Sequence, residues 1–112
     1  MTADPLAFSC HVESDEAGTT TLRLHGELDM AASPKLTGVL HELQHGGAQE
    51  IVVDLRGLSF LDSMGLSALL GAYVAGQDGH RKVSFIRGGP TVQRVFAVTE
   101  VDKRVDWVDP PV

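Results

Sequence analysis

The sequence predicts a small α/β sandwich in which helices pack on a mixed sheet of four to five strands. Two kinds of apolar spacing alternate along the 112 residues: a period of two, typical of strands, and a period of three to four, typical of helices. Two strands come first, and from then on helices and strands alternate. Helical connections between successive strands imply parallel pairing, so only the first two strands are expected to pair as an antiparallel hairpin.

The hairpin is expected at the N-terminal end of the chain. Its first strand has one half-buried face of alternating apolar residues, namely Leu6, Phe8, Cys10 and Val12. A turn-like cluster occupies residues 14–18. Alternation resumes over residues 22–28, which we interpret as the hairpin partner.

The first helix is expected to begin at Ser33-Pro34, where serine suits the N-cap and proline the first helical position. A buried stripe at helical spacing follows, made of Leu36, Val39, Leu40 and Leu43. Gly46-Gly47 ends this helix.

Ile51-Val52-Val53 is a consecutive apolar, β-branched run, which is typical of a central strand covered on both faces. We expect a loop at residues 56–58 and a second helix after Ser63. The apolar residues of that helix are Leu66, Leu69, Leu70, Tyr73 and Val74, and glycines between 76 and 79 stop it.

The remaining chain predicts a strand at residues 83–86, a turn at 88–90 and a third helix. One face of this helix carries Val92, Val95 and Phe96. A last strand is expected at residues 105–108, before Pro110-Pro111, which cannot continue a ladder.

Composition limits the function classes. The length suits one domain spanning residues 1–112, and a formal charge of −6 argues against a nucleic-acid partner. No apolar run is long enough to span a membrane, and the N-terminus lacks a signal pattern, so we expect no membrane partner and a cytoplasmic location. With Cys10 as the only cysteine, neither an internal disulfide nor a thiolate metal site is expected.

The step Asp62-Ser63-Met64-Gly65 separates the predicted central region from the second helix. A helix start presents unpaired N–H groups and the positive end of a dipole, so a serine there can act as a cap or can carry a phosphate. Either Asp62 or Ser63 can be the N-cap, and both registers leave the hydroxyl reachable.

Four segments in order resemble the anti-sigma factor antagonists of the STAS domain family, over residues 6–107. They are Gly26-Glu27-Leu28-Asp29, Ile51-Val52-Val53-Asp54-Leu55, Phe60-Leu61-Asp62-Ser63-Met64-Gly65-Leu66 and Val92-Gln93-Arg94-Val95-Phe96. The resemblance implies a single STAS domain with its core at about residues 6–108.

The resemblance also implies a role. In that family the first serine of the Asp-Ser-x-Gly step is phosphorylated by an anti-sigma factor, a kinase-like ATPase that otherwise holds a sigma factor inactive. Carried over, Ser63 is the phosphate acceptor, Asp62 and Gly65 are its motif neighbours, and Asp29 contacts the partner. Met64 departs from the small residue that relatives often carry, a difference that bears on partner identity.

The resemblance therefore implies that the protein binds an anti-sigma factor while Ser63 is unmodified, and that a phosphatase removes the phosphate from phosphorylated Ser63. Gly65 would let a partner backbone approach closely, with Met64 as an adaptable apolar contact. A phosphate beside Asp62 would add roughly −1.5 to −2 charge and oppose binding. Without the resemblance, Asp29 would be interpreted as a solvated loop carboxylate or a cap for the first helix.

Other functions are less favoured by the sequence. Asp54 at the end of a central strand suggests a phosphate-accepting aspartate, but the acidic residues Glu13, Asp15 and Glu16 lie in an expected hairpin turn, so structural hydrogen bonding is preferred. His41 and His45 have metal-ligand spacing without a third ligand.

No phosphate-cradling glycine motif and no G-x-S-x-G elbow are present, so we expect neither an enzyme nor a cofactor site. The alternative is a STAS-type module that senses a ligand or assembles with other proteins and has no dedicated kinase.

Overall fold

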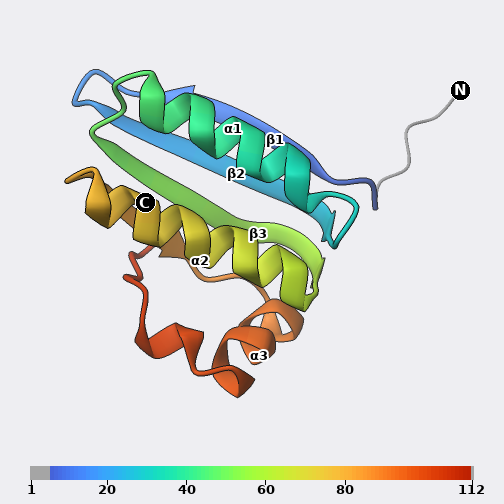
Figure 1. Ribbon diagram of the computed structural model, residues 1–112. Helices are drawn as coiled ribbons and strands as arrows, with labels where there is room; N and C mark the ends of the chain where they lie inside the picture. Colours follow the sequence, from blue (N-terminus) through green and yellow to red (C-terminus); the bar gives the residue numbers. More distant parts are fainter. Residues whose placement is uncertain (1–5, 112) are drawn as a thin grey trace, which may run out of the picture.

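The computed structural model describes residues 6–111 and confirms the α/β class. Its strands are β1 (Ser9–Ser14), β2 (Thr19–Leu28), β3 (Glu50–Leu61) and β4 (Lys82–Ile86). Its helices are α1 (Ser33–His45), α2 (Ser63–Asp78), α3 (Pro90–Val98) and the short 3-10 turn η1 (Val101–Lys103). Figure 1 shows α1 and α2 side by side over one face of the sheet, with α3 beyond its β4 side.

The sheet has the order β1-β2-β3-β4 and is mixed. β1 pairs with β2 antiparallel, which confirms the hairpin, while β3 pairs in parallel with both β2 and β4. The parallel pairs arise because α1 and α2 each return the chain to the end of the sheet at which the preceding strand began. The carboxyl ends of β2 and β3 therefore lie at the same end of the molecule.

The core lies between the sheet and the α1–α2 layer. It is built from alternate residues of β2 and β3 and from the inward stripes of the helices, including Leu22, Leu24, Ile51, Val53, Leu55, Leu36, Leu40, Leu66 and Leu69. A second group closes the β4 side, where the rings of Phe85, Phe96 and Trp107 contact one another. These residues anchor the last turn and the C-terminal segment.

Three expectations about the strands are corrected. β1 begins at Ser9, and its predicted buried face is only partly covered: Phe8 and Cys10 pack against the core, whereas Leu6 and Val12 are exposed. The reason is that β1 is an edge strand, with β2 as its only neighbour within the sheet. The expected central strand is central, but α1 and α2 cover only one of its faces, and Val52 stays half-buried.

The expected loop at residues 56–58 is wrong, because β3 continues through it to Leu61. The pairing register with β2 shifts here, and His25 pairs with Gly57. A Cβ atom on Gly57 would lie 2.5 Å from the Leu24 carbonyl oxygen of β2, so glycine is needed for the strands to approach. The turn-like residues thus mark a bulge within a strand.

Two element ends also differ from expectation. The N-cap of α1 is Ala32, so Ser33 and Pro34 are its first two helical residues. The last strand reduces to one bridge, Phe85 with Trp107, held by hydrogen bonds from the Phe85 N–H to the Asp106 carbonyl and from the Val108 N–H to the Phe85 carbonyl. No helix within residues 6–111 has the length and apolar character required to cross a bilayer.

Candidate functional site

Asp62 sets the geometry at the start of α2. Its backbone is extended, and its Oδ1 atom accepts a hydrogen bond of 2.8 Å from the Gly65 N–H. Asp62 is therefore the N-cap, which decides between the two registers that the sequence left open. Ser63 is the first helical residue and is exposed.

The second oxygen of Asp62 joins this helix to another loop. Oδ2 accepts a hydrogen bond of 2.9 Å from the Met30 N–H, and the Asp62 N–H donates to the Leu28 carbonyl at 3.2 Å. The connection after β2 is thereby fastened to the connection after β3, at the end of the sheet where both lie in Figure 1. One carboxylate holds both sides of the surface around Ser63.

Asp29 lies in the first of these connections and caps α1. Its Oδ1 atom accepts from the Ala32 N–H at 3.0 Å, and its carbonyl accepts from the Ser33 N–H and hydroxyl. These bonds satisfy the N–H groups of Ala32, the N-cap, and of Ser33, the first helical residue, which have no partner within the helix. Asp29 is half-buried. Of the two interpretations that do not need the family resemblance, a solvated loop carboxylate or a cap for the first helix, its hydrogen bonds within residues 6–111 fit the cap.

Gly65 is buried and faces inward. A Cβ atom there would lie 2.5 Å from the Leu28 carbonyl oxygen and 2.8 Å from the Leu28 Cγ atom. The interpretation of Gly65 as open backbone for a partner is therefore wrong, because the close approach it permits is between α2 and the end of β2. The glycine places Ser63 rather than presenting a surface of its own.

Two methionines are exposed beside Ser63. Met64 is 50% exposed, and Met30 is 68% exposed while its N–H is held by Asp62. Sequence reasoning missed Met30. The only signal for it in the sequence is that it directly follows Asp29, the last residue of the Gly26–Asp29 segment. Exposed methionine side chains are soft and adaptable, and such side chains near Asp62 and Ser63 are suited to contact with another protein.

The Ser63 hydroxyl is exposed and has no catalytic partner within residues 6–111. No group in the described part of the chain hydrogen-bonds it, and none can serve as its general base by contact. An anion at this first helical position would be stabilised by the positive end of the α2 dipole and destabilised by the adjacent Asp62 carboxylate.

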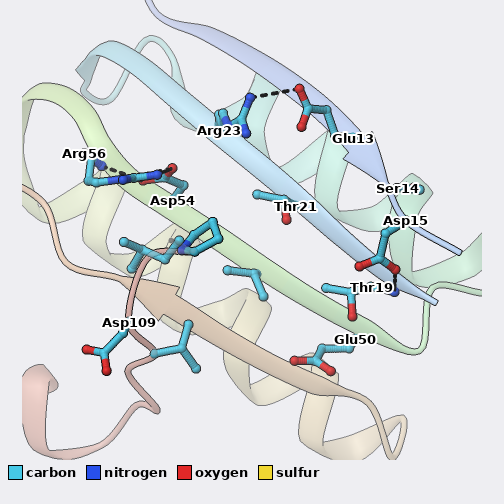
Figure 2. Close-up of a pocket in the computed structure, with 14 residues that line it drawn as sticks. Glu13, Ser14, Asp15, Thr19, Thr21, Arg23, Glu50, Asp54, Arg56 and Asp109 are labelled. Carbon is cyan, nitrogen blue, oxygen red and sulfur yellow. Dashed lines mark hydrogen bonds and ion pairs between the residues drawn. The ribbon is translucent and has the colours of Figure 1, made fainter. Parts of the chain in front are cut away.

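Asp54 has a structural role in the middle of β3 rather than at its end. Its carboxylate is buried and accepts hydrogen bonds from the Arg56 N–H, Nε and Nη2 atoms at 2.8–3.2 Å. Figure 2 shows this pair on the helix-free face of the sheet. Burial raises the pKa of Asp54, but the hydrogen bonds from Arg56 and the charges of Arg56 and Arg23 outweigh it, so the net pKa is lowered.

The acidic residues needed by a phosphate-accepting aspartate do not gather around Asp54. Asp15 lies in the β1–β2 turn, where its Oδ1 atom accepts from the Ala17 and Thr19 N–H groups. No group of three His, Cys, Asp or Glu residues within 6–111 is placed to hold a metal ion. The structure therefore supports the preferred interpretation of Asp54 as a hydrogen-bonding residue, now within a strand.

His41 and His45 are exposed on α1 with ring centroids 4.0 Å apart, and His45 Nδ1 lies 2.9 Å from the His41 carbonyl. Cys10 is half-buried, and burial raises the pKa of its thiol against the opposing charge of Lys35. A thiol that stays protonated is a poor nucleophile. Neither feature adds chemistry to the Ser63 surface.

Comparison with known proteins agrees with this fold. The family model described as "Mlab, STAS domain" matches residues 11–108. The chain is 28% identical over 78 residues to the anti-sigma-B factor antagonist of Staphylococcus aureus strain NCTC 8325 / PS 47, covering 70% of this chain and 72% of that protein.

Solved structures give the same grouping. A crystal structure of an anti-sigma factor antagonist from Mycobacterium paratuberculosis matches with a TM-score of 0.84 at 25% identity, covering 99% of this chain and 92% of that one. The anti-sigma factor antagonist SpoIIAA in its unphosphorylated form matches with a TM-score of 0.77 at 25% identity, covering 92% and 89%. The Bacillus protein SpoIIAA in its phosphorylated form shares the fold, with a TM-score of 0.72 at 23% identity over 92% of each chain.

The relatives' names describe antagonists of anti-sigma factors, which are regulatory proteins rather than enzymes. The family match covers most of the chain and includes the whole Ser63 surface. The chain therefore belongs to the STAS domain family and groups with its anti-sigma factor antagonists.

Proposed function

We propose that this protein binds an anti-sigma factor with serine kinase activity while Ser63 is unmodified, and so frees a sigma factor. Phosphorylation of Ser63 by that partner ends the binding, and a phosphatase restores it. The observation that carries the proposal is the exposed Ser63 hydroxyl at the first position of α2, next to a carboxylate that is held in place by two N–H groups. The role requires the cytoplasm, where sigma factors act.

The physical basis is a change of charge on a surface that must lose water. The exposed Met30, held at Asp62 by its N–H, and the exposed Met64, next to Ser63 in the chain, supply apolar contact area. A phosphate adds roughly −1.5 to −2 charge beside Asp62, and burying that charge against a partner incurs desolvation and like-charge repulsion. Coupling free energies of about 1–3 kcal/mol are typical of such switches, a five- to 150-fold change in affinity.

No refolding is needed for this switch. The Asp62 carboxylate is already bonded on both oxygens, and α2 begins at Ser63 with its dipole directed at the added charge. SpoIIAA in unphosphorylated and phosphorylated forms shares the fold of this chain, which supports a switch that acts on the surface.

The proposal predicts opposite effects of two substitutions. Ser63→Ala should leave affinity for the purified anti-sigma factor within about twofold and abolish phosphorylation, because it removes only the hydroxyl. Ser63→Asp should weaken binding by about five- to a hundredfold, because it introduces a charge into the interface. Affinity is measured by calorimetry, and phosphorylation by intact mass after incubation with candidate kinases and ATP.

Ser67→Ala is the matched control, since Ser67 is an exposed serine one turn further along α2. This variant should still gain one phosphate, mapped to Ser63. Equal affinity of Ser63→Ala and Ser63→Asp for the partner would refute the charge mechanism. Absence of phosphorylation with every candidate kinase, together with a ligand-dependent rise in melting temperature, would favour the ligand-sensing alternative.

A further inference from the structure

The sheet face opposite α1 and α2 contains a groove that the Ser63 surface does not use. Figure 2 views this face, with the helices behind the strands. The groove has a volume of about 470 Å³ and runs from the β1–β2 turn to the C-terminal segment. Its floor includes the apolar side chains Val52 of β3, Ile86 of β4 and Val108 of the C-terminal segment. No helix within residues 6–111 covers it, although three of the four strands are parallel and such strands are usually covered on both faces.

Negative charge predominates around this floor. The lining residues include five carboxylates and two guanidinium groups, an excess of three negative charges. Both guanidinium groups are engaged within the chain: Arg23 with Glu13 at 2.8 Å, and Arg56 with Asp54 at 2.8 Å. The potential in the groove is therefore set by the remaining carboxylates, Asp15, Glu50 and Asp109.

These three carboxylates come from separate segments and stand around the groove in Figure 2. Asp15 uses only Oδ1 in its turn, Glu50 lies 4.0 Å from the exposed Lys82, and Asp109 has no partner among residues 6–111. They do not converge on one point, since no three acidic side chains of the described chain could hold a metal ion. The arrangement suits several positive charges distributed along a chain.

Ser84 adds an unsatisfied polar group on the same face. It pairs in register with Val52, and Ile86 follows two residues later, so strand alternation places all three on the groove side of the sheet. The Ser84 side chain is fully buried, and its hydroxyl has no hydrogen-bond partner within the described residues. The fold by itself thus leaves a buried polar group unpaired beneath this face of the sheet, although Ser84 does not line the groove itself.

We propose that this groove binds an extended, basic segment of a partner protein. Lysine or arginine side chains would lay their methylene groups on Val52, Ile86 and Val108 and direct their charged ends to Asp15, Glu50 and Asp109. Phosphate-bearing ligands are disfavoured, because they would meet an excess of carboxylates. The groove and Ser63 lie on different faces, so the inference does not depend on the proposed switch.

The test uses a fluorescent octapeptide of alternating lysine and valine, with an octapeptide of alternating glutamate and valine as the probe control. The intact protein should bind the lysine peptide only, more weakly at high salt, with amide shifts in ¹⁵N NMR at Thr21, Val52 and Ile86. The double variant Glu50→Gln, Asp109→Asn should bind about three- to tenfold more weakly.

The matched control is Glu42→Gln, Asp78→Asn, which removes the same net charge at exposed positions of α1 and α2. Its affinity should stay within twofold of the unsubstituted protein. An equal loss in both double variants would show nonspecific attraction and overturn the proposal. So would shifts of the groove amides on adding ADP but not the lysine peptide. Both results leave the Ser63 measurements unaffected, so the two proposals can fail separately.

Discussion

At the scale of single residues, Asp62 does the most to define the site. An N-cap normally satisfies one helical N–H group, but this carboxylate also accepts from Met30, 32 residues earlier in the sequence. The bond holds the Met30 backbone against the start of α2. Asp62, which is the sequence neighbour of the proposed phosphate acceptor Ser63, therefore also joins the two loops of this surface.

Replacing Asp62 should disturb both helix and loop. Asp62→Ala removes the acceptor for two N–H groups and should lower the free energy of unfolding by about 1–2 kcal/mol, measured by urea denaturation followed by Trp107 fluorescence. Hydrogen exchange of the Met30 amide should become faster, because its acceptor is gone. Asp78→Ala, at the other end of α2, should change stability by less than about 0.5 kcal/mol. Unchanged exchange at Met30 in Asp62→Ala would contradict this account.

At the scale of elements, α2 carries glycines with opposite roles. Gly65 and Gly76 allow contact with the sheet: a Cβ atom would lie 2.5 Å from the Leu28 carbonyl oxygen at Gly65 and 2.4 Å from Val83 Cγ2 at Gly76. Gly71 is exposed, and a Cβ atom there would extend into open space, with no tertiary contact within 4 Å. Glycines on one side of α2 therefore let the helix pack closely on the sheet. The exposed Gly71 makes no such contact and only adds to the conformational entropy lost on folding.

Alanine substitutions separate these roles. Gly71→Ala should raise the free energy of unfolding by about 0.5–1 kcal/mol, because alanine restricts the unfolded chain and meets nothing in the folded one. Gly65→Ala should lower it by about 1–3 kcal/mol, since the backbone of β2 must move away. Thermal and urea unfolding of the two variants provide the measurement. A change of the same sign in both would disprove the packing argument for Gly65.

At the scale of the whole molecule, charge is distributed unevenly over two faces. The chain has a formal charge of −6, and the helix-free face contains the buried Asp54 with Arg56 and an excess of carboxylates. The stretch of α2 from Ser63 to Gln77 contains no charged residue. An uncharged helix beside Ser63 suits an interface from which water must leave, whereas the carboxylate-lined groove suits basic partners.

The Asp54–Arg56 pair predicts how stability depends on pH. Because the folded pKa of Asp54 is lowered, its contribution is fully present above the unfolded pKa of about 3.9 and is lost as pH falls through the folded value. Asp54→Asn should lower the free energy of unfolding by about 1–2 kcal/mol at pH 7, a modest value because Arg56 is half exposed. Urea denaturation from pH 7 to pH 2.5 should show that the difference in free energy of unfolding between Asp54→Asn and the unsubstituted protein becomes smaller below about pH 4.

Arg56→Gln is the companion variant, since it removes the partner that lowers the Asp54 pKa. The difference in free energy of unfolding between Arg56→Gln and the unsubstituted protein should also become smaller below about pH 4. The free energies of unfolding of Asp54→Asn and the unsubstituted protein could instead differ by the same amount from pH 7 to pH 2.5. That result would mean that the charge of the Asp54 carboxylate does not contribute to stability.

Much of the architecture is evident from local spacing. The hairpin and the three helices follow from apolar periods of two and of three to four, because these periods decide which side chains share one face. The central β3 follows from the consecutive β-branched run at residues 51–53. The loop predicted at residues 56–58 was wrong because Arg56 and Gly57 interrupt the apolar run, and only the pairing of Gly57 with His25 shows that they form a bulge within the strand. The prediction of an exposed serine at a helix start needed nothing beyond the chain itself.

The sequence alone determined the class of fold, the family motifs and the position of Ser63, because these depend on neighbours within a few residues or one turn. Tertiary structure decided which residues share the site. It placed the Met30 backbone against Asp62, turned Gly65 inward against Leu28, and brought Asp15, Glu50 and Asp109 around one groove. Contacts between residues 30 to 90 positions apart depend on how strands pair and on which face the helices cover, and no local period of the sequence contains that information.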